Sequence, residues 1–123
     1  MNVLRVLFVT SVLIVISMTP GIANEISKDD WINGMTTALP VALCKSDQFF
    51  RQCFSVTQEE CEEVALSATR VCIENNRERI PSRINQPEDG RYWGQIIGGC
   101  VGPAYVIALK DKKINNEKCN NWK

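Results

Sequence analysis

Six cysteines are the residues whose type and spacing could do chemistry in this chain of 123 residues. No two of them have the short C-x₂₋₄-C spacing that is typical of zinc sites, and no redox CxxC pair is present. An even number of cysteines in a short exported chain is typical of a disulfide framework. We therefore expect disulfides, with no metal, from Cys44, Cys53, Cys61, Cys72, Cys100 and Cys119.

Acid–base chemistry has few candidate groups here. The sequence contains no histidine, which removes Ser-His and Cys-His nucleophile pairs and the side chain that most often transfers protons near neutral pH. Two carboxylate groups remain, Asp29 with Asp30 and the glutamates at 59–63. Both lie in first turns of predicted helices, where the helix dipole favours acidic residues. We expect no enzymatic activity and no cofactor.

The N-terminal residues 1–23 have the pattern of a secretory signal peptide. A short basic start precedes the apolar run 6–18, then Pro20 breaks the helix and small residues end at Ala23. The alternative is an uncleaved membrane anchor. Cleavage leaves a single domain, residues 24–123, with 13 basic against 14 acidic residues, because Arg5 is removed. This balance argues against nucleic acid as a partner. Without an Asn-x-Ser/Thr site, export indicates a periplasmic or secreted bacterial protein.

Apolar periodicity and helix caps predict an all-α fold. Ser27 and Thr57 are predicted N-caps, and Thr57 with Glu60 forms a capping box. Proline is expected to end or kink the first helix at Pro40 and to kink the last at Pro103. The predicted fold is a small disulfide-stapled domain of about four helices, with a loop at 82–89 and no strands. The predicted helices cover 28–39, 47–54 with Ser46 as its cap, 58–79 and 87–109.

The symmetry of four cysteines suggests a pairing. Positions 53 and 61 are centred on 57, and 44 and 72 are centred on 58. Two antiparallel helices that turn at 55–57 would join Cys53 to Cys61 and Cys44 to Cys72. The two remaining cysteines, at 100 and 119, would then pair, although six cysteines permit 15 pairings in all. Cys61 and Cys72 are eleven residues apart, close to three helical turns, so we expect them on one face of their helix.

An uncharged stretch of 18 residues, 92–109, contains glycines at 94, 98 and 102. Glycines at this spacing make a smooth helix surface that lets another helix approach closely. One interpretation is a membrane-active segment, which makes membrane association an alternative. The interpretation we favour is a buried helix that packs against the helix at 58–79.

Mixed aromatic and charged residues at the start of the last helix are typical of a recognition surface. These candidate partner-binding residues are Arg83, Glu88, Asp89, Arg91, Tyr92 and Trp93. Trp93 has a second interpretation, as a core residue. A stapled scaffold without catalytic groups favours a non-catalytic protein-binding domain of the bacterial envelope, such as a periplasmic inhibitor or immunity protein. The alternatives are an accessory component of an envelope or secretion assembly and a small membrane-active protein.

Overall fold

A computed structural model describes residues 24–123 and confirms the small all-α, disulfide-stapled domain. The predicted signal peptide at 1–23 lies outside the described residues. The elements, in chain order, are β1 (Glu25–Ser27), α1 (Lys28–Leu43), α2 (Phe49–Gln52), α3 (Gln58–Asn76), β2 (Arg83–Asn85), α4 (Glu88–Ala108), the 3₁₀ helix η1 (Lys110–Lys112) and α5 (Glu117–Asn120).

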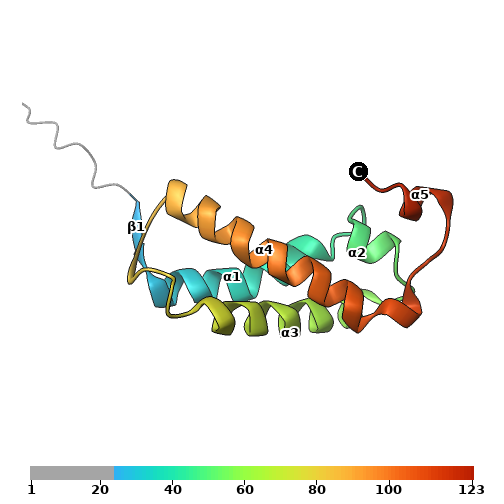
Figure 1. Cartoon of the computed structure of the whole chain (residues 1–123), viewed down its shortest axis with the longest axis horizontal. Coiled ribbons are helices and arrows are strands. Elements are labelled where there is room, and N and C mark those ends of the chain that lie inside the picture. The colour runs from blue at the N-terminus through green and yellow to red at the C-terminus, as the bar shows by residue number, and fades with distance from the viewer. Residues whose placement is uncertain (1–23) are drawn as a thin grey trace, which may run out of the picture.

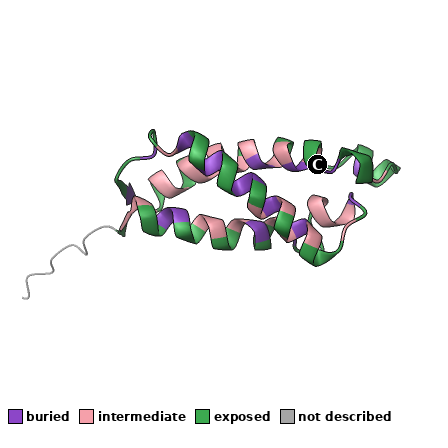
Figure 2. Ribbon diagram, turned by 90° about the horizontal axis from the view of Figure 1, so that it is seen from below, coloured by how far each residue is buried: buried purple, intermediate pink, exposed green. Residues whose placement is uncertain are grey.

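Three long helices, α1, α3 and α4, form the body of the domain and alternate in direction along it (Figure 1). The helix α3 packs against both α1 and α4. At one end, β1 and β2 pair antiparallel, with Ile26 opposite Ile84. At the other end lie α2, η1 and α5. Buried residues lie along the sides by which the long helices face one another (Figure 2).

The predicted helix starts at Ser27 and Thr57 are confirmed. The hydroxyl of Ser27 accepts a hydrogen bond from the Asp30 backbone N–H, and that of Thr57 accepts one from the Glu60 N–H, each at 3.1 Å. Each cap satisfies one of the backbone donors that a helix leaves unpaired at its first turn. The predicted placement of Cys61 and Cys72 on one face of α3 is also confirmed, since both are buried together with Ala65 and Ala68 between them.

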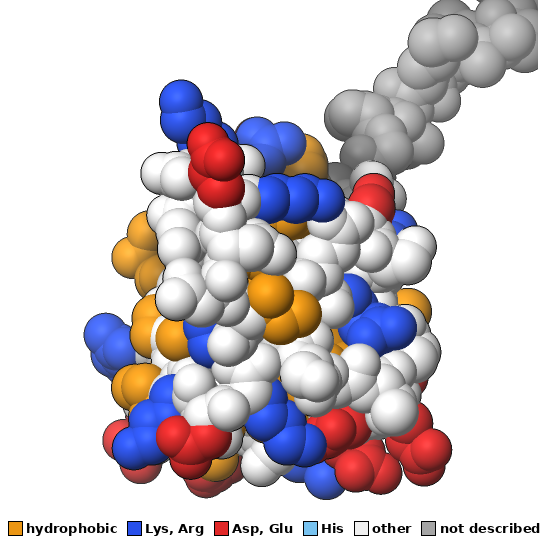
Figure 3. Space-filling view, turned by 90° about the vertical axis from the view of Figure 1, so that its right-hand side faces the viewer, with side chains coloured by type: hydrophobic (Ala, Val, Ile, Leu, Met, Phe, Trp, Pro, Cys, Tyr) orange, Lys and Arg blue, Asp and Glu red, His pale blue; other side chains and the backbone are white. Residues whose placement is uncertain are grey.

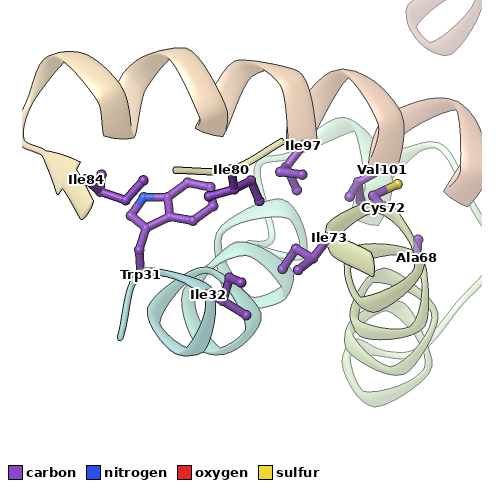
Figure 4. Close-up of a cluster of buried hydrophobic side chains, with 9 residues drawn as sticks. All are labelled: Trp31, Ile32, Ala68, Cys72, Ile73, Ile80, Ile84, Ile97 and Val101. Atoms are coloured by element: carbon purple, nitrogen blue, oxygen red, sulfur yellow. The ribbon is translucent and has the colours of Figure 1, made fainter. Parts of the chain in front are cut away.

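The core has two parts. The first lies near the β-ribbon, where the Trp31 indole ring lies beside Ile80 and Ile84, while Ile97 and Val101 of α4 face α3 (Figure 4). The second part surrounds Cys44, Cys61 and Tyr105 at the opposite end. All three long helices therefore bury an apolar stripe, which is the main stabilising contribution in a domain of this size.

Several predicted boundaries were wrong. The first helix runs through Pro40 to Leu43, and the Cys44 N–H donates to the Pro40 carbonyl at 3.1 Å. Pro40 removes one backbone donor and its ring crowds the carbonyl four residues earlier, yet the helix continues past it to Leu43 with the ring buried. The second helix is reduced to Phe49–Gln52 and begins after Gln48 rather than Ser46. The segment 82–89, predicted to be a loop, contains β2. This strand was not predicted because three residues are too few to show the alternation typical of a strand. The third helix ends at Asn76 and not at 79.

The glycines of α4 do not mediate packing against α3, contrary to the prediction. A methyl group added to Gly94 or Gly98 would meet nothing within 4 Å, and one on Gly102 would face the Phe50 ring at 3.8 Å. The contact with α3 is made instead by apolar residues such as Ile97 and Val101. Helix α4 also continues through Pro103 to Ala108. Across residues 24–123, none of the helices combines the length and apolarity needed to cross a membrane.

All six cysteines form disulfides, as predicted, but every predicted pairing was wrong. The bonds join Cys44 to Cys61, Cys53 to Cys119 and Cys72 to Cys100. The helix that precedes α3 and packs antiparallel to it is α1, and 44–57 is the connection between them. The end of α1 therefore meets the start of α3 at Cys44–Cys61, while Cys72, in the C-terminal part of α3, is bonded to Cys100 of α4.

Candidate functional site

A long groove runs between α1 and α3, formed by two adjoining hollows of about 410 and 590 Å³ that share Thr36 and Arg70. We call it the α1–α3 groove. Its first section, near the start of α3, is walled by the last two turns of α1 and the first turns of α3. Helix α1 contributes Thr36, Thr37, Pro40 and Val41, and helix α3 contributes Glu59, Glu62, Glu63, Leu66 and Arg70.

The floor of this first section is apolar. Pro40 is buried and Leu66 is partly buried, whereas Val41 is 51% exposed. A β-branched side chain half in solvent at the wall of a groove offers apolar surface that a partner can remove from water. Because the Cys44–Cys61 disulfide lies at this end of the two helices, their separation here is fixed covalently.

Three carboxylates, all on the α3 wall, lie beside this apolar floor. Within residues 24–123 no ion pair involves Glu59, Glu62 or Glu63; Glu62 accepts a hydrogen bond from the Gln58 amide at 2.9 Å. The fourth glutamate, Glu60, binds Lys112 of η1 instead. In Figure 3, which views this end of the molecule, acidic side chains lie along the lower edge with basic side chains among them, on the side on which α3 begins. The groove is therefore acidic at this end.

The second section of the groove has a net charge of +1, because its lining contains Arg70 and Arg77 against Glu74. It extends along α1 to Ile32 and along α3 to Arg77, whose guanidinium binds Glu74 at 2.9 Å. Val71, 57% exposed, adds apolar surface beside it. The groove is thus acidic at one end, weakly basic at the other and partly apolar along its length.

The six residues predicted as a partner-binding surface lie at the end of the domain that holds the β-ribbon, away from the first section of the groove. The structure gives them different roles. Arg83 lies on β2 with its guanidinium 3.7 Å from Glu25. Asp89 accepts a hydrogen bond from the Asn85 N–H at 2.8 Å, which ties β2 to the start of α4. Trp93 is partly buried against the first core cluster. The remaining three, which are exposed, are Glu88, Arg91 and Tyr92.

Tyr92 and Trp93 are the two members of this set whose rings meet. Their centroids lie 5.2 Å apart at an interplanar angle of 88°, and Tyr92 is 59% exposed. An exposed aromatic ring supported by a second ring is a common anchor in protein interfaces. We call the exposed residues of this end, Glu88, Arg91 and Tyr92, the end surface.

A cluster of aromatic rings lies at the end of the domain that holds α2 and α5, and it was not predicted from the sequence. The rings of Phe49, Phe50, Phe54, Tyr105 and Trp122 contact one another with centroid distances of 4.7 to 5.6 Å. The grouping of three phenylalanines at 49–54 was visible in the sequence, but their meeting with α4 and the tail depends on the fold. The Ile114 N–H also donates to the Cys53 carbonyl at 2.8 Å. The cluster and the Cys53–Cys119 disulfide hold the tail to the body.

The largest hollow, about 850 Å³, lies at this tail, but it has no second wall. All of its lining residues come from 116–123. A site that positions a ligand needs walls from elements held rigidly relative to each other, and the α1–α3 groove and the smaller α3–α4 hollow described below meet this condition.

Tyr105 is the titratable group that its surroundings perturb most clearly. Burial raises the pKa of the Tyr105 hydroxyl to about 12; nearby Arg51 opposes this increase and Glu60 adds to it. The hydroxyl donates a hydrogen bond to the Phe50 carbonyl at 2.9 Å. This bond joins α4 to α2 inside the second core cluster, so the perturbed group has a structural role.

This pKa gives a prediction for alkaline pH. The folded protein holds the Tyr105 proton more tightly than the unfolded chain, so the stability from this proton is present below pH 10 and is lost as pH rises from 10 to 12. In a Tyr92→Phe variant, in which Tyr105 is the one remaining tyrosine, tyrosinate absorbance at 295 nm should rise with a midpoint near 12. A midpoint near 10 while the protein is still folded would contradict the buried, hydrogen-bonded hydroxyl.

The fold and disulfides define the class of the protein: a small, exported, disulfide-stapled domain of three long helices. Its sequence from 25 to 113 matches the family model described as T2SS substrate NttA, and the chain belongs to this family. No curated protein and no solved structure matches the chain significantly.

A substrate of the type II secretion system is exported, so the family agrees with the export that was predicted from the signal-peptide pattern and the cysteines. The matched segment contains the whole α1–α3 groove, the end surface and five of the six cysteines. Cys119 lies beyond it.

Proposed function

We propose that this exported domain is a non-catalytic binder of another protein and that it acts after release from the bacterial cell. The observation that supports it best is the α1–α3 groove, a partly apolar channel with exposed Val41 and Val71 on a frame closed by disulfides. A rigid surface loses little conformational entropy when it binds, which favours affinity.

The size of the groove suits a segment of a protein. Together its two sections extend along α1 from Ile32 to Val41 and along α3 from Glu59 to Arg77. A helix or an extended strand of a partner can lie in a channel between two helices and place side chains along it at regular intervals. The groove is open along its length and does not enclose a small molecule as a deep pocket would.

The test compares two exposed apolar side chains on different surfaces. Val41 is in the groove, whereas Ile107, 71% exposed, lies near the end of α4 and outside the groove. The exported protein is immobilised and used to capture proteins from the producing culture and from cells grown with it. Val41→Ser should lower the affinity for the captured partner about tenfold, because truncating an interface anchor removes about 1–2 kcal/mol of binding free energy. Ile107→Ser should leave it unchanged.

Two results would contradict the proposal. If both variants bind the partner with the same affinity as the unchanged protein, the groove is not part of the interface. A loss with Tyr92→Ala but not with Val41→Ser would move binding to the end surface. Release is tested separately: the protein should be in the medium of cells with a working type II system and inside the periplasm of cells without one. Retention in both strains would contradict release.

A further inference from the structure

We infer that the partner segment seated in the first section of the α1–α3 groove is basic, with lysine or arginine residues beside an apolar side chain. This inference rests on the proposed function and specifies the partner's chemistry. It follows from how the charges and the apolar surface are arranged in that section.

The charge of the first section is negative. Its lining contains Glu59, Glu62 and Glu63 against Arg70, a net of −2. The positive end of the α3 dipole corresponds to roughly half a charge, so it does not cancel this excess. The domain as a whole is nearly neutral, with 13 basic and 14 acidic residues in 24–123. The acidic character is therefore local to the groove.

These carboxylates are available to a partner. The lysine-rich tail reaches the start of α3, but Lys112 binds Glu60, which does not line the groove. Glu59 and Glu63 are exposed on α3, and no ion pair within residues 24–123 occupies them. A basic segment would meet carboxylates already held in place by the first turns of a capped helix.

The apolar side chain of the segment is expected to pack on the apolar floor of this section. Val41 of α1 and Leu66 of α3 both line this section, together with the buried Pro40. Exposed ion pairs contribute little free energy each, so most of the affinity should come from the apolar anchor. The carboxylates select the sign of the partner's charge and raise the association rate.

The alternative docking surface is the hollow between α3 and α4, about 400 Å³ and lined mainly by small apolar side chains such as Val64, Ala104 and Ala108. Apart from Glu63 at one edge, this hollow has no charged residue that would define a partner. The α1–α3 groove has the charge pattern that this second hollow lacks.

The test uses a defined probe, a short capped peptide with one leucine between two pairs of lysines, and the exported protein with its disulfides intact. Binding is followed by NMR from amide chemical-shift changes. The lysine peptide should shift the amides around Val41 and Leu66, and raising the salt concentration should weaken the binding because it screens exposed charges. Peptides with glutamate in place of lysine, or serine in place of leucine, should bind at least about tenfold more weakly.

A matched pair of protein variants separates the groove from general charge. Glu59→Lys with Glu63→Lys should weaken binding of the lysine peptide at least about tenfold. Asp29→Lys with Glu78→Lys changes the net charge equally and should change binding less than about twofold. Asp29 occupies the same position in the first turn of α1 that Glu59 has in α3, and neither control residue lines the groove.

The outcomes distinguish this inference from the proposed function. Shifts centred on Tyr92 or on the tail, equal losses in the two double variants, or equal binding of the glutamate peptide would overturn the basic segment. Shifts of the groove amides with protein concentration alone would assign the groove to a second copy and overturn it too. If the lysine peptide does not bind while capture of a protein still depends on Val41, only the inference of a basic segment is contradicted. If capture does not depend on Val41, the proposed function is contradicted.

Discussion

Replacing Trp31 with alanine should lower the free energy of unfolding by about 3–5 kcal/mol, the range for truncating a large buried aromatic side chain. Trp31 is 4% exposed and lies beside Ile80 and Ile84 in the first core cluster (Figure 4). It joins the start of α1 to the segment that follows α3. Its removal would leave a cavity that the surrounding side chains, held between helices and the β-ribbon, can fill only partly.

The measurement is denaturant unfolding followed by far-UV circular dichroism. Trp122→Ala is the control, because Trp122 is 37% exposed and contacts Phe49 at the edge of the second cluster. The control should lose much less stability than Trp31→Ala. Similar losses for the two variants would mean that Trp31 is not the centre of the first cluster.

Replacing Cys72 and Cys100 together with alanine should lower the free energy of unfolding by about 3–4 kcal/mol. This bond joins residues separated by 28 positions, and the chain-entropy model gives about 3.6 kcal/mol for closing such a loop. The bond is the one covalent link between α3 and α4 in the part of the chain that the structure describes. Its loss leaves their contact to apolar packing.

The unfolding transition of the double variant, compared with that of the unchanged protein, measures this effect. Peptide mapping without reduction should recover Cys72 linked to Cys100, Cys44 to Cys61 and Cys53 to Cys119. Recovery of Cys53 linked to Cys61 would contradict the fold, because it would restore the hairpin that the sequence symmetry suggested.

The sequence predicted the features that depend on residues close together in the chain. The helix starts at Ser27 and Thr57 are local hydrogen bonds, so the cap residues alone identified them. The stripe from Cys61 to Cys72 follows from helical periodicity within α3. The helical class and the use of every cysteine in a disulfide also follow from such local signals and from composition.

Pairings between distant segments could not be predicted in the same way. The symmetric spacing of four cysteines suggested that residues 44–54 form the helix opposite α3, but only Phe49–Gln52 are α-helical there. The true partner, α1, continues through Pro40 to Leu43 with the proline ring buried. That continuation moved Cys44 to the end of a long helix and changed every disulfide.

The candidate site illustrates the same limit. The glutamates at 59–63 were explained by the helix dipole, and their place at the start of α3 agrees with that explanation. Their meeting with Val41 and Pro40 across a groove depends on α1 and α3 lying side by side. The predicted partner-binding residues, by contrast, lie near each other in sequence but have separate roles, since Asp89 and Arg83 help to hold the β-ribbon and Trp93 packs on the core.

Site-specific photo-crosslinking tests protein binding through the α1–α3 groove most directly. Benzoylphenylalanine is placed at Val41 in one variant and at Ile107 in the other, since both positions are exposed and only the first lines the groove. After illumination with proteins of the culture and of cells grown with it, position 41 should give one defined cross-linked protein, joined through a lysine- or arginine-containing segment. Position 107 should not give it. No product from position 41, or the same products from both positions, would contradict the account.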